Sequence, residues 1–189
     1  MTVPKVTQEH LDARRAQILE GAGRAFAQYG YDGATVARLE EAIGLSRGAI
    51  FHYFNGKKDL FAEVAIDVNR KFVGVIQTGG LGDALREIAN ASPELLEVLF
   101  ETQARLHRDE DFMRRLEEAS EEELRPDLET WFEEQREKGA FRTDIDWADL
   151  ARFATIVTNG LALRVAIGDP TDVDTVVRLL EDALRPQPS

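Results

Sequence analysis

The side chains best suited to recognising another molecule are concentrated in positions 35–60, which read TVARLEEAIGLSRGAIFHYFNGKKDL. Arg47, Phe51 and His52 fall toward the outside of a short predicted helix. An exposed phenylalanine beside an arginine needs a partner other than water. A tight turn at 43–45 joins this helix to a preceding one, an arrangement that lets the second helix enter a major groove of DNA. The chemistry expected here is therefore non-covalent recognition of a nucleic acid.

Cap and turn residues bound the helices that must position this stretch. Thr35 is the expected N-cap of a helix that stops near Gly44, and Ser46 is the expected cap of the next helix, over 47–54. A longer apolar stripe with helical period precedes them and ends at Gly30, where a left-handed turn is expected. The apolar residues expected to pack the two short helices together are Val36, Leu39, Ile43, Leu45 and Ile50.

This stretch closely resembles the TetR family of transcriptional repressors. The family signature is a Thr, a Leu four residues later, a Gly-apolar-Ser/Thr turn, an aromatic-rich segment and a Lys. The residues that meet this pattern are Thr35, Leu39, Gly44, Leu45, Ser46, Ile50, Tyr53, Phe54, Lys57 and Leu60. The string RLEEAIGLSRGAIF is most similar to the actinobacterial branch that includes the aconitase repressor. Two residues depart from the usual pattern: Glu40 replaces a small residue, and Phe51 replaces a tyrosine that would bind phosphate.

The resemblance implies which residues would contact DNA: Thr35, Arg38, Arg47, Gly48, Phe51, His52, Tyr53 and Lys57. Arg47 would read a base edge, with bidentate pairing to guanine as the first choice, while Gly48 would let the backbone approach the groove. Phe51 would lie against a thymine methyl group, and the remaining residues would hold phosphates. Lys57 would be helped by the positive end of the following helix. The alternatives are that His52 only closes a helix at the surface and that Arg47 is a solvated charge.

The net charge of −12 is unevenly distributed along the chain. Residues 1–60 hold eight Lys and Arg against seven Asp and Glu, a net charge of +1, so the remainder carries −13. Phosphate neutralisation by basic side chains supplies most of the non-specific affinity for DNA. Any contact with DNA must therefore come from the first 60 residues.

Composition disfavours several classes of protein. The chain has no cysteine, which excludes a disulfide framework, a thiolate nucleophile and a Cys-based metal site. No apolar run approaches the roughly 18 residues needed to cross a membrane, and the polar start lacks the apolar core of a signal peptide. We therefore expect a cytoplasmic protein with no metal, no cofactor and no membrane partner.

We call the stretch of two short helices and their flanking turns, residues 35–60, the reader. Beyond the reader, the apolar pattern predicts helices and no strands, so the expected fold class is all-α. Residues 78–82 are the most linker-like segment, and the expected domains are a three-helix DNA-binding domain, 1–68, and a helical effector-binding and dimerisation domain, 69–189. The last two helices are expected over 147–167 and 172–184, with capping boxes at Asp146–Asp149 and Thr171–Asp174. Because the first of these helices is apolar on two faces, we expect a homodimer through this pair.

An effector pocket is expected among polar and aromatic residues embedded in the apolar helices of the second half, because such polar groups are costly to bury without a partner. The candidates are Phe100, Glu101, Arg105, Trp131, Asn159 and Arg164. Arg105 and Arg164 would suit a carboxylate ligand. The alternative is that these residues are ordinary core or ion-pair residues.

The function that these features predict is a repressor that binds a palindromic DNA operator as a dimer and responds to a small-molecule effector. Two other functions compete with it. A small helical enzyme with an acid-base pair is disfavoured, because no HExxH sequence, no histidine beside a serine and no Gly-rich phosphate loop is present. An acidic adaptor that binds proteins and not DNA would leave Arg47, Phe51 and the Tyr53-Phe54 pair unexplained.

Overall fold

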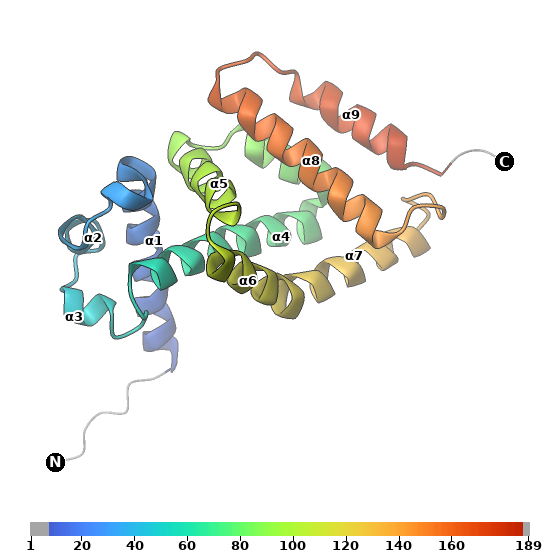
Figure 1. The fold of residues 1–189 in the computed structure, drawn as a ribbon. Helices are drawn as coiled ribbons and strands as arrows, with labels where there is room; N and C mark the ends of the chain where they lie inside the picture. The colour runs from blue at the N-terminus through green and yellow to red at the C-terminus, as the bar shows by residue number, and fades with distance from the viewer. Residues whose placement is uncertain (1–7, 187–189) are drawn as a thin grey trace. The chain divides into compact units, whose positions relative to one another are not determined.

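The computed structural model of the chain describes residues 8–186, and every regular element in that range is a helix (Figure 1). The predicted all-α fold class is confirmed. The chain forms two compact units. The first contains the described residues up to Asp67 together with Pro93–Leu116, and the second contains Val68–Ser92 and the described residues from Glu117 onward.

The first unit is built on α1 (Gln8–Gly33), α2 (Val36–Ile43), α3 (Arg47–Ile50), the start of α4 (Lys57–Ala89), α5 (Pro93–Leu106) and most of α6 (Glu110–Ala119). Its core is aromatic. The Phe61 ring meets Phe26 edge to face at 4.9 Å between centroids and lies stacked with Phe112 at 5.5 Å. All three rings are at most 2% exposed. Helix α5 packs against α1, so the core of this unit includes residues well beyond position 68.

The predicted caps of the two short helices are confirmed. The Thr35 hydroxyl oxygen accepts the Arg38 N–H, and the Ser46 hydroxyl oxygen accepts the Ala49 N–H. Gly44 ends α2 in the left-handed region, with φ 74°. Gly30 has φ 65° and interrupts the first helix, as its spacing predicts, although helical geometry resumes to Gly33.

Helix α3 is shorter than predicted. It ends at Ile50 instead of near Phe54, because the Tyr53 N–H donates to the Ile50 carbonyl oxygen and closes a turn. That turn carries the Phe54 ring into the core, where it is 3% exposed.

The second unit contains the rest of α4, a π-helical turn η1 (Ser120–Leu124), α7 (Arg125–Glu137), α8 (Trp147–Ala166) and α9 (Val173–Leu184). The segment predicted to be a linker, 78–82, is helical on both sides of a single break at Gly80, where φ is 81°. Gly82 allows close packing of α9, since a Cβ there would lie 3.0 Å from Val177 Cγ1.

One predicted helix start in the second unit needs correction, that of α9. At the start of α7, Pro126 lies in the first turn, directly after the π-helical turn. Proline has no N–H to donate and its ring crowds the preceding turn of helix. Both effects favour a widened, π-helical turn directly before it. The N-cap of α9 is Asp172, one residue after the predicted Thr171. The Asp172 carboxylate accepts from the Thr175 N–H and hydroxyl, while the Thr171 hydroxyl donates to Asp169.

The N-cap of α8 is Asp146, as predicted, and its carboxylate accepts the Asp149 N–H at 2.8 Å. The two last helices begin and end within one residue of their predicted bounds. None of the helices in residues 8–186 combines the length and the apolar character that a membrane span requires.

Candidate nucleic-acid interface

Side chains of α1 form hydrogen bonds with the end of α2, next to the turn that leads to α3. The Gln17 side-chain amide donates to the Ile43 carbonyl oxygen at 3.2 Å, and the Arg24 guanidinium donates to the Ala42 carbonyl oxygen at 3.1 Å. Gly21 lies between them, and a Cβ there would come within 2.7 Å of Ile43 Cα. Two side chains of α1 therefore bind carbonyl groups that the end of α2 leaves unpaired, and a glycine brings the two helices into contact.

Helix α3 presents its first residues to solvent and its last to the core. Arg47 and Gly48 are exposed, whereas Ile50 is fully buried. Space around Gly48 is open, since a Cβ there would meet nothing within 4 Å. This arrangement brings a guanidinium and an unobstructed backbone to the same surface.

The aromatic residues after α3 are only partly exposed. Phe51 and Tyr53 are half-buried, so Phe51 is less exposed than its predicted outward position implies. His52 is exposed, and its ring meets Tyr53 edge to face at 5.5 Å between centroids. The predicted reader residues from Arg47 to Tyr53 thus lie in one short segment.

Two of the predicted phosphate-binding cations are tied to the turn that ends α1. The Arg38 guanidinium donates to the Gly33 carbonyl oxygen at 2.8 Å and lies 4.2 Å from the Tyr29 ring centroid. The Lys57 ammonium donates to the Asp32 carbonyl oxygen at 3.3 Å and lies 4.5 Å from the Tyr31 ring centroid. These contacts limit the rotamers of both cations before any phosphate arrives.

The environment of Lys57 also shifts its pKa. Partial burial lowers the pKa of Lys57, and the nearby Arg105 guanidinium lowers it further, while Asp32 acts in the opposite direction. Burial likewise raises the pKa of the Tyr31 hydroxyl. A phosphate near Lys57 would favour its protonated form.

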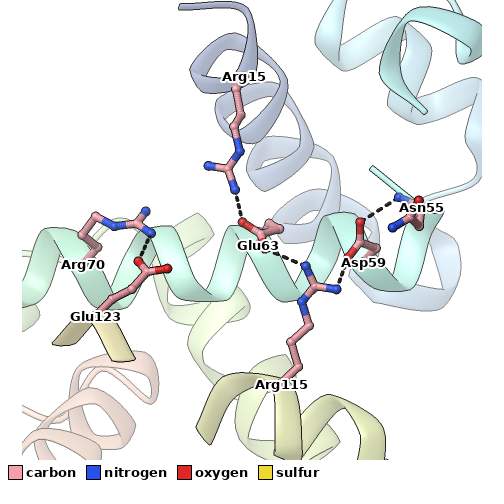
Figure 2. A network of polar contacts seen from close by, with 7 residues as sticks. All are labelled: Arg15, Asn55, Asp59, Glu63, Arg70, Arg115 and Glu123. Atoms are coloured by element: carbon pink, nitrogen blue, oxygen red, sulfur yellow. Dashed lines mark hydrogen bonds and ion pairs between the residues drawn. The ribbon is translucent and has the colours of Figure 1, made fainter. Parts of the chain in front are cut away.

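A network of ion pairs, which sequence reasoning missed, surrounds the first two turns of α4 (Figure 2). Arg115 of α6 pairs with Asp59, and its guanidinium donates to Glu63 at 2.7 Å. Glu63 also pairs with Arg15 of α1, and Asp59 accepts the Asn55 N–H at 2.7 Å. The network therefore joins α1, α4 and α6 to the turn that follows α3. Asp59 resembles an ordinary acidic residue of a first helical turn, so nothing local in the sequence identifies its partner.

Three of the predicted effector-pocket residues, Phe100, Glu101 and Arg105, lie on α5 in the first unit and are half-buried. The Arg105 guanidinium lies 3.3 Å from the Tyr31 ring centroid. It also forms ion pairs with Glu101, Asp109 and Asp32 at 3.3, 3.6 and 3.9 Å. Arg105 thus binds residues of the reader's own unit.

The other three, Trp131, Asn159 and Arg164, lie on α7 and α8 in the second unit. Trp131 meets the Phe141 ring at 5.7 Å between centroids, Asn159 is exposed, and Arg164 pairs with Asp169. The second unit also has an open groove of about 420 Å³, which none of these three residues lines. Its lining consists of Val75, Thr78, Gly79, Asp83, Arg86, Glu87 and Asn90. Within residues 8–186, no group of three His, Asp or Glu side chains gathers in a way that could hold a metal ion.

Two family models match this chain. Residues 18–64 match the bacterial regulatory proteins of the tetR family, and residues 83–187 match the C-terminal region of BetI-type transcriptional repressors. The first match covers the helix-turn-helix described above. The second covers more than half of the chain.

Curated relatives align with almost the whole chain. The transcriptional repressor Rv1474c of Mycobacterium tuberculosis is 39% identical over 186 residues, covering 97% of this chain and 99% of the relative. The transcriptional repressor AcnR of Corynebacterium jeikeium is 38% identical, with 97% and 98% covered. The similarity to the actinobacterial branch is therefore confirmed, and it extends from the stretch RLEEAIGLSRGAIF through the second half of the chain.

Solved structures share the fold. Salmonella enterica GusR superposes with a TM-score of 0.75 at 19% identity, covering 96% of this chain and 98% of GusR. A TetR transcription regulator from Haloarcula marismortui superposes with a TM-score of 0.67 at 24% identity, covering 92% and 99%. The matched families consist of regulatory proteins and not of enzymes. By its helix-turn-helix reader, its all-helical fold and these full-length relatives, this chain belongs to the TetR family of bacterial transcriptional regulators.

Proposed function

We propose that this chain is a repressor that binds a palindromic DNA operator as a homodimer and is regulated by a small-molecule effector. The observation that carries the proposal is the exposed Arg47 side chain at the first position of α3, next to the open backbone at Gly48. Within residues 8–186 the Arg47 guanidinium has no carboxylate partner, so it is free to pair with the edge of a guanine. Repressor activity is the function printed for the relatives in Mycobacterium and Corynebacterium.

The proposed phosphate contacts come from residues on both sides of α3. Thr35 and Arg38 stand at the start of α2, and Lys57 stands at the start of α4. His52 and Tyr53 lie in the turn between α3 and α4. Phosphate contacts on both flanks would fix the register of the reader on the duplex, while Arg47 supplies base preference.

Exposed apolar side chains on α8 and α9 support dimerisation through these helices. Ile156 and Leu163 of α8 and Ile167 at its C-cap are 63%, 54% and 69% exposed, and Leu179 of α9 is 61% exposed. Spacings of seven and four residues put these three side chains on one stripe of the helix. A stripe of large apolar groups in contact with water is unfavourable, and a second copy of the same stripe would cover it. Such a dimer would place two readers about one DNA turn, roughly 34 Å, apart.

The effector is proposed to be a small molecule with a carboxylate, recognised by Arg105 or Arg164. Both arginines already have carboxylate partners, Glu101, Asp109 and Asp32 for Arg105 and Asp169 for Arg164. A carboxylate ligand would therefore replace an existing ion pair, and its binding would change the contacts of the helix that carries the arginine. As a DNA-binding regulator, the protein is proposed to act in the cytoplasm.

The experiment that tests this function is selection of bound duplexes from random DNA by the purified protein at about 150 mM salt, where non-specific binding is weakened. Enrichment of a palindrome supports a dimeric reader. Failure of the wild-type protein to enrich any sequence would overturn the proposal. Arg47→Ala is the matched control, because it removes the base-reading side chain and leaves the caps of α3 in place.

A further inference from the structure

Glu40 binds both sides of the turn that connects α2 to α3. Its backbone carbonyl oxygen accepts the Gly44 N–H at 2.8 Å, on the α2 side of the turn. Its carboxylate Oε1 accepts the Arg47 N–H at 2.6 Å, at the first residue of α3. Glu40 as a residue is half-buried, and its hydrogen bond to the Arg47 N–H lies at the exposed surface of the unit. One residue of α2 therefore fixes where the turn begins and where the reading helix starts.

Helix α3 depends on such end contacts because it has only four residues, Arg47–Ile50. Short helices are marginal on their own, since few internal hydrogen bonds offset the cost of ordering the backbone. The Ser46 hydroxyl binds the Ala49 N–H at 3.4 Å, which is long for a hydrogen bond. The Glu40 contact is shorter and has a charged acceptor, which makes it the stronger of the two.

The same carboxylate bears on DNA because of where it lies. It is hydrogen-bonded to the backbone of Arg47, whose side chain is the proposed base reader. A negative charge at this end of α3 repels phosphates wherever the protein sits on a duplex. It does so on operator and random DNA alike, so by itself it lowers affinity without adding preference.

We propose that Glu40 is a positioning and specificity-determining residue: it fixes the backbone from which Arg47 reads its base, while its charge weakens binding to all DNA alike. On a cognate site the correctly aimed Arg47 regains the affinity that the charge removes. On random DNA nothing regains it. The second part of this inference rests on the proposed DNA-reading function, whereas the first part concerns the backbone of α3 alone.

Glu41 is a matched control for Glu40. It is the next residue of α2, carries the same charge and is exposed, and within the described part of the chain its side chain forms no hydrogen bond or ion pair. We would compare Glu40→Ala, Glu40→Gln, Glu41→Ala and Glu41→Gln with wild type. Each protein would be titrated with the selected operator and with a random duplex of equal length, and the ratio of the two affinities would be compared.

Glu40→Ala is expected to lower the ratio of operator to random affinity by about ten-fold, the loss of one charge-assisted hydrogen bond. Glu40→Gln keeps an acceptor oxygen, so its ratio should stay close to wild type while its affinity for both duplexes rises. The two Glu41 variants should bind both duplexes more tightly and leave the ratio unchanged. Equal ratios for Glu40→Ala and Glu41→Ala would overturn the specificity role.

A second measurement tests positioning without DNA. Amide hydrogen exchange of Arg47, followed by NMR, should accelerate by about ten-fold in Glu40→Ala and stay at the wild-type rate in Glu41→Ala. An unchanged Arg47 rate in Glu40→Ala would overturn the positioning role even if DNA binding were weakened. If wild type selected no operator, the proposed function would fail, and the exchange rates would still decide whether Glu40 fixes α3.

Discussion

Arg115 of α6 forms an ion pair with Asp59 in the first turn of α4, and the same Asp59 carboxylate accepts the backbone N–H of Asn55 in the turn after α3 (Figure 2). The Asp59 side chain is only 11% exposed. A carboxylate so far removed from water needs a cationic partner, and that partner comes from a helix distant in sequence. A side chain of α6 therefore helps to hold the reader in place, and most of α6 belongs to the same compact unit as the reader.

Arg115→Met should destabilise the first unit. The variant keeps much of the apolar stem but leaves Asp59 and Glu63 without the shared guanidinium. We expect a loss of about 1 to 2 kcal/mol in the free energy of unfolding, less than for a fully buried pair because Arg115 is 40% exposed. Urea denaturation followed by circular dichroism would measure it.

The control for this variant is Arg114→Met, at the neighbouring position of α6. The Arg114 side chain is 66% exposed and pairs with Asp111 three residues away. Its loss should change stability by less than about 0.5 kcal/mol, as for most surface pairs. Equal effects of the two substitutions would show that burial of Asp59 does not make the Arg115 pair special.

The division of the chain shows what sequence could and could not predict. The functional boundary expected between residues 68 and 69 stays a prediction. The segment 78–82 resembles a linker only because it is rich in glycine. The structure instead assigns Pro93–Leu116 to the same compact unit as the reader. That assignment depends on contacts such as the ion pair between Arg115 and Asp59. Because these two residues are far apart in sequence, no local sequence pattern predicts their contact.

Gly21→Ala should disrupt the contact between α1 and α2. A Cβ at this position would lie 2.7 Å from Ile43 Cα and 2.9 Å from the Ala42 carbonyl oxygen. Both are backbone atoms that cannot rotate away, so the helices must separate. We expect a loss of about 1 to 3 kcal/mol in unfolding free energy and weaker binding to the selected operator.

Gly23→Ala provides the control in the same helix. There the new Cβ would meet Val64 Cγ1 at 3.8 Å, an ordinary contact. Replacing a helical glycine by alanine without a clash should stabilise by about 0.5 to 1 kcal/mol. Opposite changes in melting temperature for the two variants would support the close approach at Gly21, and a neutral Gly21→Ala would refute it.

Arg47→Ala and Lys57→Ala should affect DNA binding in different ways. Loss of the proposed base reader should cost about 1 to 3 kcal/mol on the selected operator and relax preference at one base position. Loss of Lys57, the proposed phosphate anchor, should weaken operator and random DNA alike and reduce the salt dependence by about one counterion. Competition titrations over a range of salt would separate the two. Equal losses on both kinds of DNA for both variants would contradict these roles.

The reader itself was largely predictable because its helix ends depend on local chemistry. The side chains of Thr35 and Ser46 cap the starts of α2 and α3, and Gly44 adopts the left-handed conformation that ends α2. The early end of α3 was not predictable, because the four-residue spacing of Ile50 and Phe54 fits a continued helix equally well, and the turn that the Tyr53 N–H closes is seen only in the structure. Glu40 stood out in the sequence as a departure, but its hydrogen bond to the Arg47 N–H could be found only in the structure.

Leu163→Glu should weaken the proposed dimer. Leu163 is 54% exposed on the apolar stripe of α8, and in a symmetric dimer a charge placed there would be buried without a partner. We expect dimer dissociation to become easier by about 100-fold or more, measured by sedimentation velocity over a range of concentrations. Met113→Glu is the control, since Met113 is an exposed apolar residue that belongs to α6 of the first unit and is not part of this stripe. Dimers of unchanged stability in Leu163→Glu would exclude α8 as the interface.

The contact of Lys58 with α6 should make part of the stability depend on pH. The Lys58 ammonium lies 2.8 Å from Asp109 Oδ1. The hydrogen bond from Lys58 holds the pKa of Asp109 below its usual value, and the hydrogen bond to Asp109 raises the pKa of Lys58. Stabilisation by the pair is thus present above the ordinary carboxyl pKa and is lost as pH falls through the lower value of the folded protein.

Lys58→Met should accordingly lower the melting temperature at neutral pH, and its difference from wild type should shrink once the pH falls below the ordinary carboxyl pKa and Asp109 becomes protonated. The difference should also shrink in strong alkali, where Lys58 of the wild type loses its proton. Arg152→Met, which removes an exposed pair with Asp149, should follow wild type throughout. A difference between Lys58→Met and wild type that stays constant as the pH falls until the carboxylates are fully protonated would mean that packing of the lysine stem, and not its charge, stabilises the contact.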